Sequence, residues 1–466
     1  MEMIVRLTGQ QHASLRAHLF PGDGNEAVAL ALCGRRAGRN RHILTVRRIV
    51  PVPHEQCSVR TPERVTWPTD LLPPLLAEAE RRGEAVLKVH SHPGGLSRFS
   101  HVDDGADRDL FASVYGWTDG KEPHASAVLL PDGRMFGRTV AVDGTFVPLA
   151  RIAVAGEDIH MWQDSVGSDE VPDFAVRHAQ AFGAGTTGML GQLSVGVVGC
   201  SGTGGPVIEM LARLGVGELV LVDPDRVERK NLNRINNTFA GDALVGRFKV
   251  HALADAVRAM GLGTRVVAMP QSLFDPGVAL RVAECDVVFG CMDSVDGRDL
   301  LNRISAFYLV PYFDVGVRLD ADGMGGVDQI CGTVHYLQPD GSSLLSRGLY
   351  TSDQLQAAAL RRADPAAYEE RLKEKYIIGV QEDRPAVVSV NTLFAALAVN
   401  ELLARLHSYR DDGNTGFARF GMSLTQARLW GEADGEPCPA LARQVGKGDV
   451  RPPLGMPELS GGDPCS

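Results

Sequence analysis

The sequence has no C-x-x-C cysteine pair, no long apolar run and no excess of basic residues. Its eight cysteines are scattered, which argues against a disulfide framework and against a cysteine zinc knuckle. No run approaches the roughly 20 apolar residues that cross a bilayer, and the first residues do not form a secretory signal, so we expect a cytoplasmic protein. The net charge of −10 argues against a nucleic-acid partner, because binding phosphates requires clustered Lys and Arg.

The length of 466 residues predicts two to three domains. Residues 1–160 alternate short apolar runs with turns marked by Pro and Gly, which indicates a mixed α/β domain. Residues 161–173 lie in a polar, acidic stretch that is typical of a linker. In residues 174–430, strands such as LSVGVVG, ELVLVD and CDVVFGCMD alternate with helices, which predicts a doubly wound parallel sheet. Residues 431–466 form a Gly- and Pro-rich tail to which we assign no structure.

His90 and His92 lie two residues apart at the end of the run AVLKVHSH. On a strand both imidazoles would point to one side, and a Pro-Gly-Gly loop then leads to Ser100 and Asp103. A carboxylate from a following helix would supply a third metal ligand. Three ligands leave one position open, which is typical of a catalytic zinc site. Asp104 is an adjacent carboxylate, and we interpret His101 and His124 as bystanders.

The spacing H-S-H, seven residues, Ser, two residues, Asp resembles that of the JAMM (JAB/MPN-domain) zinc isopeptidases, which cleave at the C-terminus of ubiquitin-like proteins. The resemblance implies Zn²⁺ bound by His90, His92 and Asp103, with Ser100 stabilising the oxyanion. It also implies a glutamate on an earlier strand as general base. Glu26, just before the run AVALALC, has the matching placement. Glu55 and Glu63 are competitors, whereas Glu84 lies too near the metal-binding strand in sequence.

A glycine-rich turn follows the strand LSVGVVG and opens a helix, so that backbone amides can receive phosphate oxygens. It contains Gly199, Gly202 and Gly204. Asp223 ends the next strand, where an acidic residue commonly binds a ribose hydroxyl. These features suit a dinucleotide enzyme equally well.

The residues downstream decide between these interpretations. Asp225, Asn231, Arg234 and Lys249, followed by Cys291-Met-Asp293 with Arg298 and Asn302, resemble the motifs of the ThiF-like adenylyltransferases, which are relatives of ubiquitin-activating enzymes. The resemblance runs from about residue 177 to about residue 407. It implies that Arg234 and Lys249 neutralise ATP phosphates, that Asp293 holds Mg²⁺ and that Asn231 orients the nucleotide.

Three features depart from that family pattern. Ser201 replaces the middle glycine of the turn, and Gln180 stands where relatives carry an arginine that crosses a dimer interface, with Arg177 nearby as a substitute. The segment between residues 335 and 390 contains no cysteine, which argues against a thioester on this chain. Cys438 and Cys465 lie in the tail, where a mobile thiol could serve transfer chemistry.

Together the two resemblances imply a bifunctional enzyme of a bacterial ubiquitin-like conjugation pathway. One domain would adenylate the C-terminus of a modifier and the other would process or remove it. A conjugating enzyme would carry the acceptor cysteine, the chain would form a homodimer, and fused relatives of this kind include some that serve antiphage defence. An alternative is activation of a peptide or sulfur-carrier protein for small-molecule or cofactor synthesis, with the protease trimming the precursor. A third reading is a non-catalytic scaffold that binds modifiers.

Overall fold

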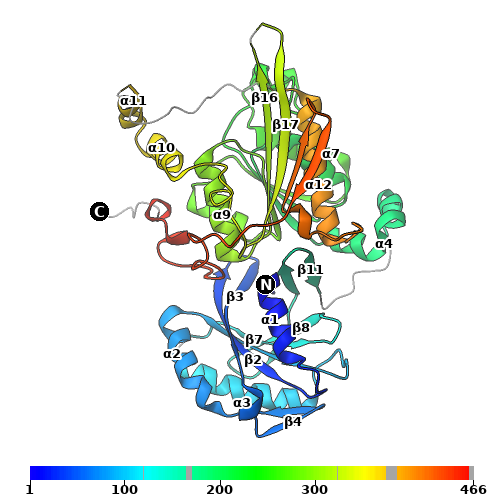
Figure 1. The fold of residues 1–466 in the computed structure, drawn as a ribbon, viewed down its shortest axis with the longest axis vertical. Coiled ribbons are helices and arrows are strands. Elements are labelled where there is room, and N and C mark those ends of the chain that lie inside the picture. Colours follow the sequence, from blue (N-terminus) through cyan, green and yellow to red (C-terminus); the bar gives the residue numbers. More distant parts are fainter. Residues whose placement is uncertain (119, 164–170, 323, 374–385, 461–466) are drawn as a thin grey trace. The chain divides into compact units, whose positions relative to one another are not determined.

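The computed structural model describes residues 1–118, 120–163, 171–322, 324–373 and 386–460 (Figure 1). The chain forms two compact units. The first contains Met1–Val166, Phe307–Leu309 and Gln444–Gly455, and the second contains the remainder. The predicted linker lies in part outside the described residues, and its first two residues belong to a strand, β11 (Ile159–Trp162).

The first unit is built on a nine-stranded mixed sheet in the order β11-β10-β1-β3-β2-β6-β7-β8-β9. Its strands are β1 (Glu2–Thr8), β2 (Val28–Ala37), β3 (Arg41–Pro51), β6 (Ala85–Ser91), β7 (His124–Leu129), β8 (Met135–Val140), β9 (Phe146–Pro148) and β10 (Arg151–Ala155), besides β11. A separate hairpin consists of β4 (Val59–Thr61) and β5 (Arg64–Thr66). The sequence therefore forms the mixed α/β domain that it predicts.

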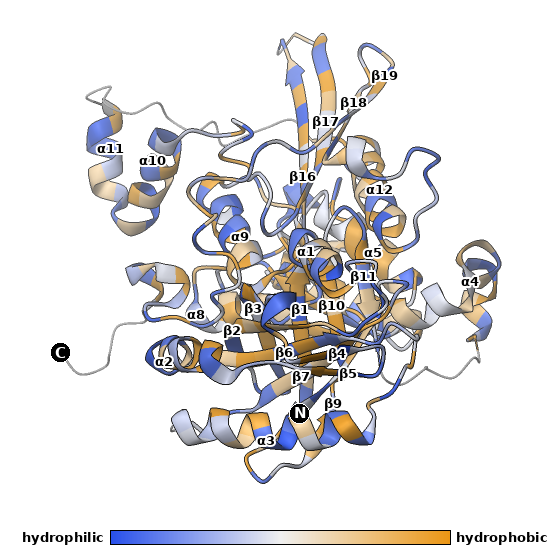
Figure 2. Cartoon of the chain, turned by 60° about the horizontal axis from the view of Figure 1, so that its bottom comes forward, coloured by the Kyte–Doolittle hydropathy of each residue, from blue (hydrophilic) through white to orange (hydrophobic). Residues whose placement is uncertain are grey.

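Apolar side chains cover both faces of this sheet. Its central strands are buried on both sides and therefore carry nearly continuous apolar runs. Helix α1 (Gly9–Leu19) packs Leu15 and Leu19 into the core on one face. Helices α2 (Leu72–Arg82) and α3 (His101–Trp117) pack on the other. Strands β6 and β7 are correspondingly hydrophobic (Figure 2).

A C-terminal segment completes the first unit beside β2 and β3. Gly448 forms a bridge with Arg35 of β2. The Thr45 hydroxyl of β3 donates to the Gly446 carbonyl at 2.9 Å, and the Asp449 amide donates to the Arg35 carbonyl at 2.6 Å. The segment after residue 431 thus has a defined backbone as far as residue 460, contrary to the expectation of an unstructured tail.

The second unit is built on an eight-stranded sheet in the order β14-β13-β12-β15-β16-β17-β18-β19. The parallel strands are β12 (Ser194–Val198), β13 (Glu218–Val222), β14 (Arg265–Met269), β15 (Val287–Gly290) and β16 (Tyr312–Ala321). The antiparallel extension is β17 (Val327–Leu337), β18 (Arg419–Ser423) and β19 (Arg428–Glu432). Polar and apolar residues alternate along the outer parts of β16 and β17 (Figure 2).

Nine helices are described in this unit and its connections: α4 (Val176–Leu190), α5 (Gly204–Arg213), α6 (Ala240–Leu244), α7 (Lys249–Met260), α8 (Pro276–Ala283), α9 (Val295–Tyr308), α10 (Ser352–Ala363), α11 (Pro365–Lys373) and α12 (Val388–Leu406). The predicted capping box of Thr351 and Gln354 opens α10. The α/β class with a doubly wound sheet is confirmed. Within the described part of the chain, no helix has the length and apolarity needed to cross a membrane.

Candidate functional sites

The end of strand β6, the residue after it and helix α3 bring His90, His92 and Asp103 together. The His90 Nε2 lies 3.1 Å from His92 Nε2 and 2.9 Å from Asp103 Oδ1, and His92 Nε2 lies 3.4 Å from Asp103 Oδ2. Two atoms that each lie 2.0–2.1 Å from a tetrahedral zinc are about 3.3 Å apart, so the triad fits such an ion. Among the described residues, no other group of three His, Cys, Asp or Glu side chains gathers this closely.

Neighbouring hydrogen bonds orient two of these side chains. His92 Nδ1 donates to the Leu96 carbonyl at 2.7 Å, which leaves Nε2 free for the triad. Ser100 is the N-cap of α3, and both its amide and its hydroxyl donate to Asp103 Oδ2 at 2.7 Å. Ser100, to which the resemblance assigns an oxyanion role, thus holds the Asp103 carboxylate in place.

Glu26 lies beside the triad because of the register between β2 and β6. Val28 pairs with His90 in antiparallel register, and continuing that register places Glu26 opposite His92. Glu26 is 6% exposed, and burial raises the pKa of its carboxyl group to about 7. A carboxylate with that pKa suits a general base at neutral pH.

The competing glutamates are placed differently. Glu55 and Glu63 are exposed, and Glu84 forms an ion pair with Arg47. The bystander histidines also lie outside the triad: His101 is exposed, and His124 of β7 accepts a hydrogen bond from the Val86 amide at 2.9 Å. Among the glutamates considered, Glu26 has the placement that a base would need.

The second unit contains a cavity of about 500 Å³ at the carboxyl ends of its parallel strands. Pockets of about 300–1,000 Å³ accommodate ligands of nucleotide size. The predicted residues that line it are Gly199, Gly202, Asp223, Asp225, Arg234, Lys249 and Asp293. Side chains of both charge signs thus meet in one cavity, as a triphosphate with a divalent cation requires.

The turn between β12 and α5 needs glycine for backbone packing. Gly199 has φ +90°, and a Cβ on it would lie 2.7 Å from the Cys291 carbonyl oxygen. A Cβ on Gly204 would lie 1.9 Å from the Gly199 carbonyl oxygen. Ser201, the departure from the glycine pattern, lines the cavity without such a constraint.

Hydrogen bonds and ion pairs hold two acidic residues of the cavity, Asp223 and Asp225, in place. Asp223 Oδ2 accepts from the Cys200 amide at 2.7 Å, which ties the end of β13 to the glycine-rich turn. Lys249 Nζ lies 2.7 Å from Asp225 Oδ2 and 3.9 Å from Asp223 Oδ1. Burial raises the pKa of Asp223. Lys249 is therefore held at the cavity by two carboxylates.

Some predicted residues do not line the cavity. Gly204 and Asn231 are not among the lining residues. Asn231 is 3% exposed, and its Oδ1 accepts a hydrogen bond from the Glu228 amide. Arg177 and Gln180 are exposed on α4 and are not among the lining residues.

Other residues that line the cavity were not predicted from the sequence. Ser272, Leu273 and Phe274 follow β14, and Asn391 comes from α12, where only its helix was predicted. Arg298 was recognised within the family motif but given no role. Its Nε donates to the buried carboxylate of Asp314 at 2.9 Å. No local pattern marks Phe274 or Asn391, because distant segments bring them together.

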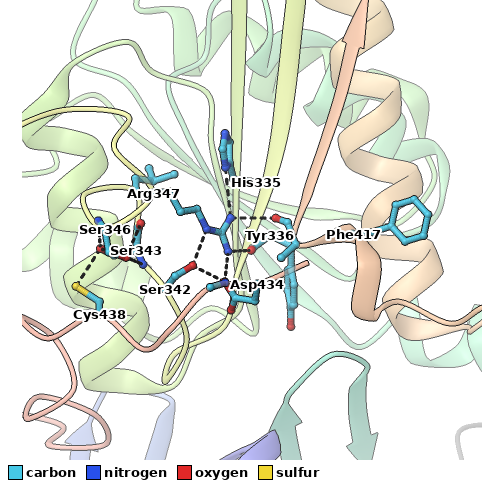
Figure 3. Close-up of polar contacts among 12 residues, drawn as sticks. His335, Tyr336, Ser342, Ser343, Ser346, Arg347, Phe417, Asp434 and Cys438 are labelled. Atoms are coloured by element: carbon cyan, nitrogen blue, oxygen red, sulfur yellow. Dashed lines mark hydrogen bonds and ion pairs between the residues drawn. The ribbon is translucent and has the colours of Figure 1, made fainter. Parts of the chain in front are cut away.

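Cys438 is buried rather than mobile. It is 3% exposed, and its Sγ lies 3.1 Å from Ser343 Oγ. Nearby, Arg347 donates to Asp434, to Ser342 and to the Tyr336 carbonyl, which holds the chain before Cys438 in place (Figure 3). The expectation of a mobile thiol at Cys438 is wrong, and Cys465 lies outside the described residues.

Two family models match the chain. The ThiF family matches residues 176–436, more than half of the chain. The chain belongs to the ThiF family. Prokaryotic homologs of the JAB domain match residues 9–131, so the protein is a fusion of JAB and ThiF domains.

Three curated ThiF relatives are similar over part of their length. Adenylyltransferase and sulfurtransferase MOCS3 of Mus musculus is 40% identical over 120 residues, which cover 25% of this chain and 26% of that protein. The SAMP-activating enzyme E1 of Haloferax volcanii is 39% identical over 25% of this chain and 42% of its own. The molybdopterin-synthase adenylyltransferase of Escherichia coli is 37% identical over 23% of this chain and 42% of its own. The chain thus matches less than half of each of these relatives.

Proposed function

We propose that this chain activates the C-terminus of a ubiquitin-like protein with ATP and Mg²⁺, and hydrolyses peptide or isopeptide bonds at such a C-terminus with Zn²⁺. Residues 1–160 would carry the hydrolytic site and residues 174–430 the adenylating site. The observation that carries the proposal is that one chain contains both a His-His-Asp triad with zinc spacing and a ThiF cavity lined by Arg234, Lys249 and Asp293.

At the hydrolytic site, His90, His92 and Asp103 would hold the ion and leave one position open. When bound, Zn²⁺ would lower the pKa of water and polarise the scissile carbonyl. Glu26 would accept a proton from the attacking water and return it to the leaving amine. The buried setting that raises the pKa of Glu26 to about 7 favours both proton transfers near neutral pH. Ser100 would orient Asp103 and donate to the developing oxyanion.

At the adenylating site, a carboxylate of the modifier would attack the α-phosphate of ATP and release pyrophosphate. Two anions must approach each other in that step, so Arg234 and Lys249 would offset their repulsion. Asp293 would hold Mg²⁺, and Asp223 would accept a hydrogen bond from the ribose. The Gly199–Gly202 turn would bring backbone amides to the phosphates.

The partners follow from this chemistry. A conjugating enzyme would supply the acceptor cysteine, since Cys200, Cys285 and Cys438 are buried and are not placed as nucleophiles. The seven cysteines that the structure describes are thiols, and by the same proposal the chain works in a reducing, cytoplasmic setting. A homodimer, a bacterial conjugation pathway and a role in antiphage defence extend the proposal by family resemblance.

The test is ATP–pyrophosphate exchange with a candidate ubiquitin-like protein, alongside cleavage of a fusion to that protein's C-terminus. We expect Asp293→Ala to abolish exchange and to spare cleavage. His92→Ala should do the reverse. Loss of both activities in both variants would refute this division of labour.

The alternative is activation of a peptide or sulfur-carrier protein for biosynthesis, which the similarity to a molybdopterin-synthase adenylyltransferase favours. Mass spectrometry after incubation with ATP separates the two functions. An adenylated tail on a ubiquitin-like conjugation modifier supports the first proposal. A modified short peptide or sulfur carrier supports the alternative.

A further inference from the structure

A buried ionic cluster lies next to the metal triad. Asp107 follows Asp103 by four residues on α3, so that both carboxylates face the sheet. Lys88 precedes His90 by two residues on β6 and therefore points to the same face. Arg138 of β8 completes the cluster. The exposed fractions of the side chains are 7% for Lys88, 0% for Asp107 and 7% for Arg138.

The sheet register places the donors in one row. Lys88 pairs with Ser126 of β7, and Ser126 pairs with Arg138. Asp107 Oδ1 accepts from Lys88 Nζ at 2.7 Å and from Ser126 Oγ at 3.1 Å. Asp107 Oδ2 accepts from Arg138 Nε at 3.1 Å and from its terminal nitrogen at 2.7 Å. Side chains from three adjacent strands thus donate hydrogen bonds to one carboxylate of α3.

Arg138 also connects the loop before α3. Its guanidinium lies 3.8 Å from the Phe99 ring centroid and 3.7 Å from that of Phe146, and it pairs with Asp104. Phe99 is the residue before Ser100, the N-cap of α3. Arg138 therefore fixes the first turn of α3 from both sides of Asp103.

Stability alone does not account for this cluster. Replacing a buried ion pair by apolar residues of similar volume is often neutral or stabilising, whereas removing one partner is strongly destabilising. Charged and bidentate hydrogen bonds also fix the relative orientation of the groups that they join. A zinc site needs that placement here, because two ligands lie on the sheet and the third lies on a helix.

We propose that Lys88, Asp107 and Arg138 are positioning residues that set the height and rotation of α3, so that Asp103 meets His90 and His92 at zinc-binding distance. This inference rests on the proposed hydrolytic function. It predicts that the cluster controls metal affinity without touching the ion.

The first test measures Zn²⁺ affinity of the full chain by competition with a chromophoric chelator. We expect Asp107→Asn to weaken affinity 10- to 100-fold, the range typical of residues that orient metal ligands. Asp109→Asn is the matched control, since it makes the same change at an exposed position of the same helix and should leave affinity unchanged. ATP–pyrophosphate exchange should be unaltered in both variants.

A second variant separates positioning from folding. The triple substitution Lys88→Met, Asp107→Leu and Arg138→Met removes the charges together, and the metal-free chain should keep its thermal midpoint. Its Zn²⁺ affinity should still fall at least tenfold. Arg138→Lys should also weaken binding, because lysine lacks the planar fork.

The outcomes distinguish the two proposals. If the unaltered chain binds no Zn²⁺, the hydrolytic function itself fails. If it binds Zn²⁺ and the Asp107→Asn and triple variants bind as tightly as Asp109→Asn, the positioning role is refuted.

Discussion

Replacing Arg298 by methionine tests the electrostatics of the cavity in the second unit. Arg298 lines the cavity and forms a bidentate ion pair with Asp314, whose side chain is 0% exposed. Without Arg298 that carboxylate stays buried without its counter-charge, which costs about 3–5 kcal/mol. In a unit of this size, we expect the thermal midpoint to fall by about 6–15 °C. Differential scanning calorimetry of the full chain would measure the shift.

Two further variants decide whether the reasoning is correct. Arg298→Met with Asp314→Asn should recover at least half of the loss, because a neutral amide needs no counter-charge and can still accept from the Tyr312 hydroxyl. Arg318→Met removes an exposed partner of Asp320 on the same strand and should cost less than about 1 kcal/mol. A double variant less stable than Arg298→Met, or equal losses at Arg298 and Arg318, would refute the account.

Three other predictions follow from buried groups. Burial lowers the pKa of His124 to about 3, so the unfolded chain binds a proton that the folded chain does not, and stability should fall by about 2 kcal/mol between pH 7 and pH 5. His124→Gln should weaken that pH dependence, measured by hydrogen exchange in β7; parallel curves would contradict it. Gly204→Ala should lower ATP affinity at least tenfold by calorimetry because of the clash with Gly199, whereas Gly241→Ala, with open space around its Cβ, should not. Cys438 should alkylate more slowly than Cys57 in brief iodoacetamide labelling followed by mass spectrometry, and equal rates would exclude its burial.

The sequence predicted best what local geometry determines. Strand periodicity places His90 and His92 on one side, and the spacing of the family motif indicates Ser100 and Asp103. All four lie within a short stretch of chain, from the end of β6 to the first turn of α3. Glu26 was more difficult, because its position depends on the pairing between β2 and β6. Only family resemblance indicated it among several glutamates.

Sequence reasoning failed where tertiary packing decides. Asn391 and Phe274 reach the cavity of the second unit from segments far from the glycine-rich turn. The Gly- and Pro-rich composition around Cys438 predicts mobility, but Arg347 and Asp434 hold that segment through a side-chain hydrogen bond. Composition does not reveal such specific contacts.

Residues 444–455 belong to the first unit, although most of the second unit precedes them in sequence, and this constrains the order in which the two units can fold during synthesis. This segment is synthesised about 280 residues after the last strand of the sheet that it completes. At about 5–20 residues per second, that distance is a delay of about 15–60 s. During that interval β2, the strand that begins just after Glu26, lacks its last neighbour. The first unit should therefore be complete only in chains whose second unit has already been synthesised, and truncated chains would lack the segment that completes it.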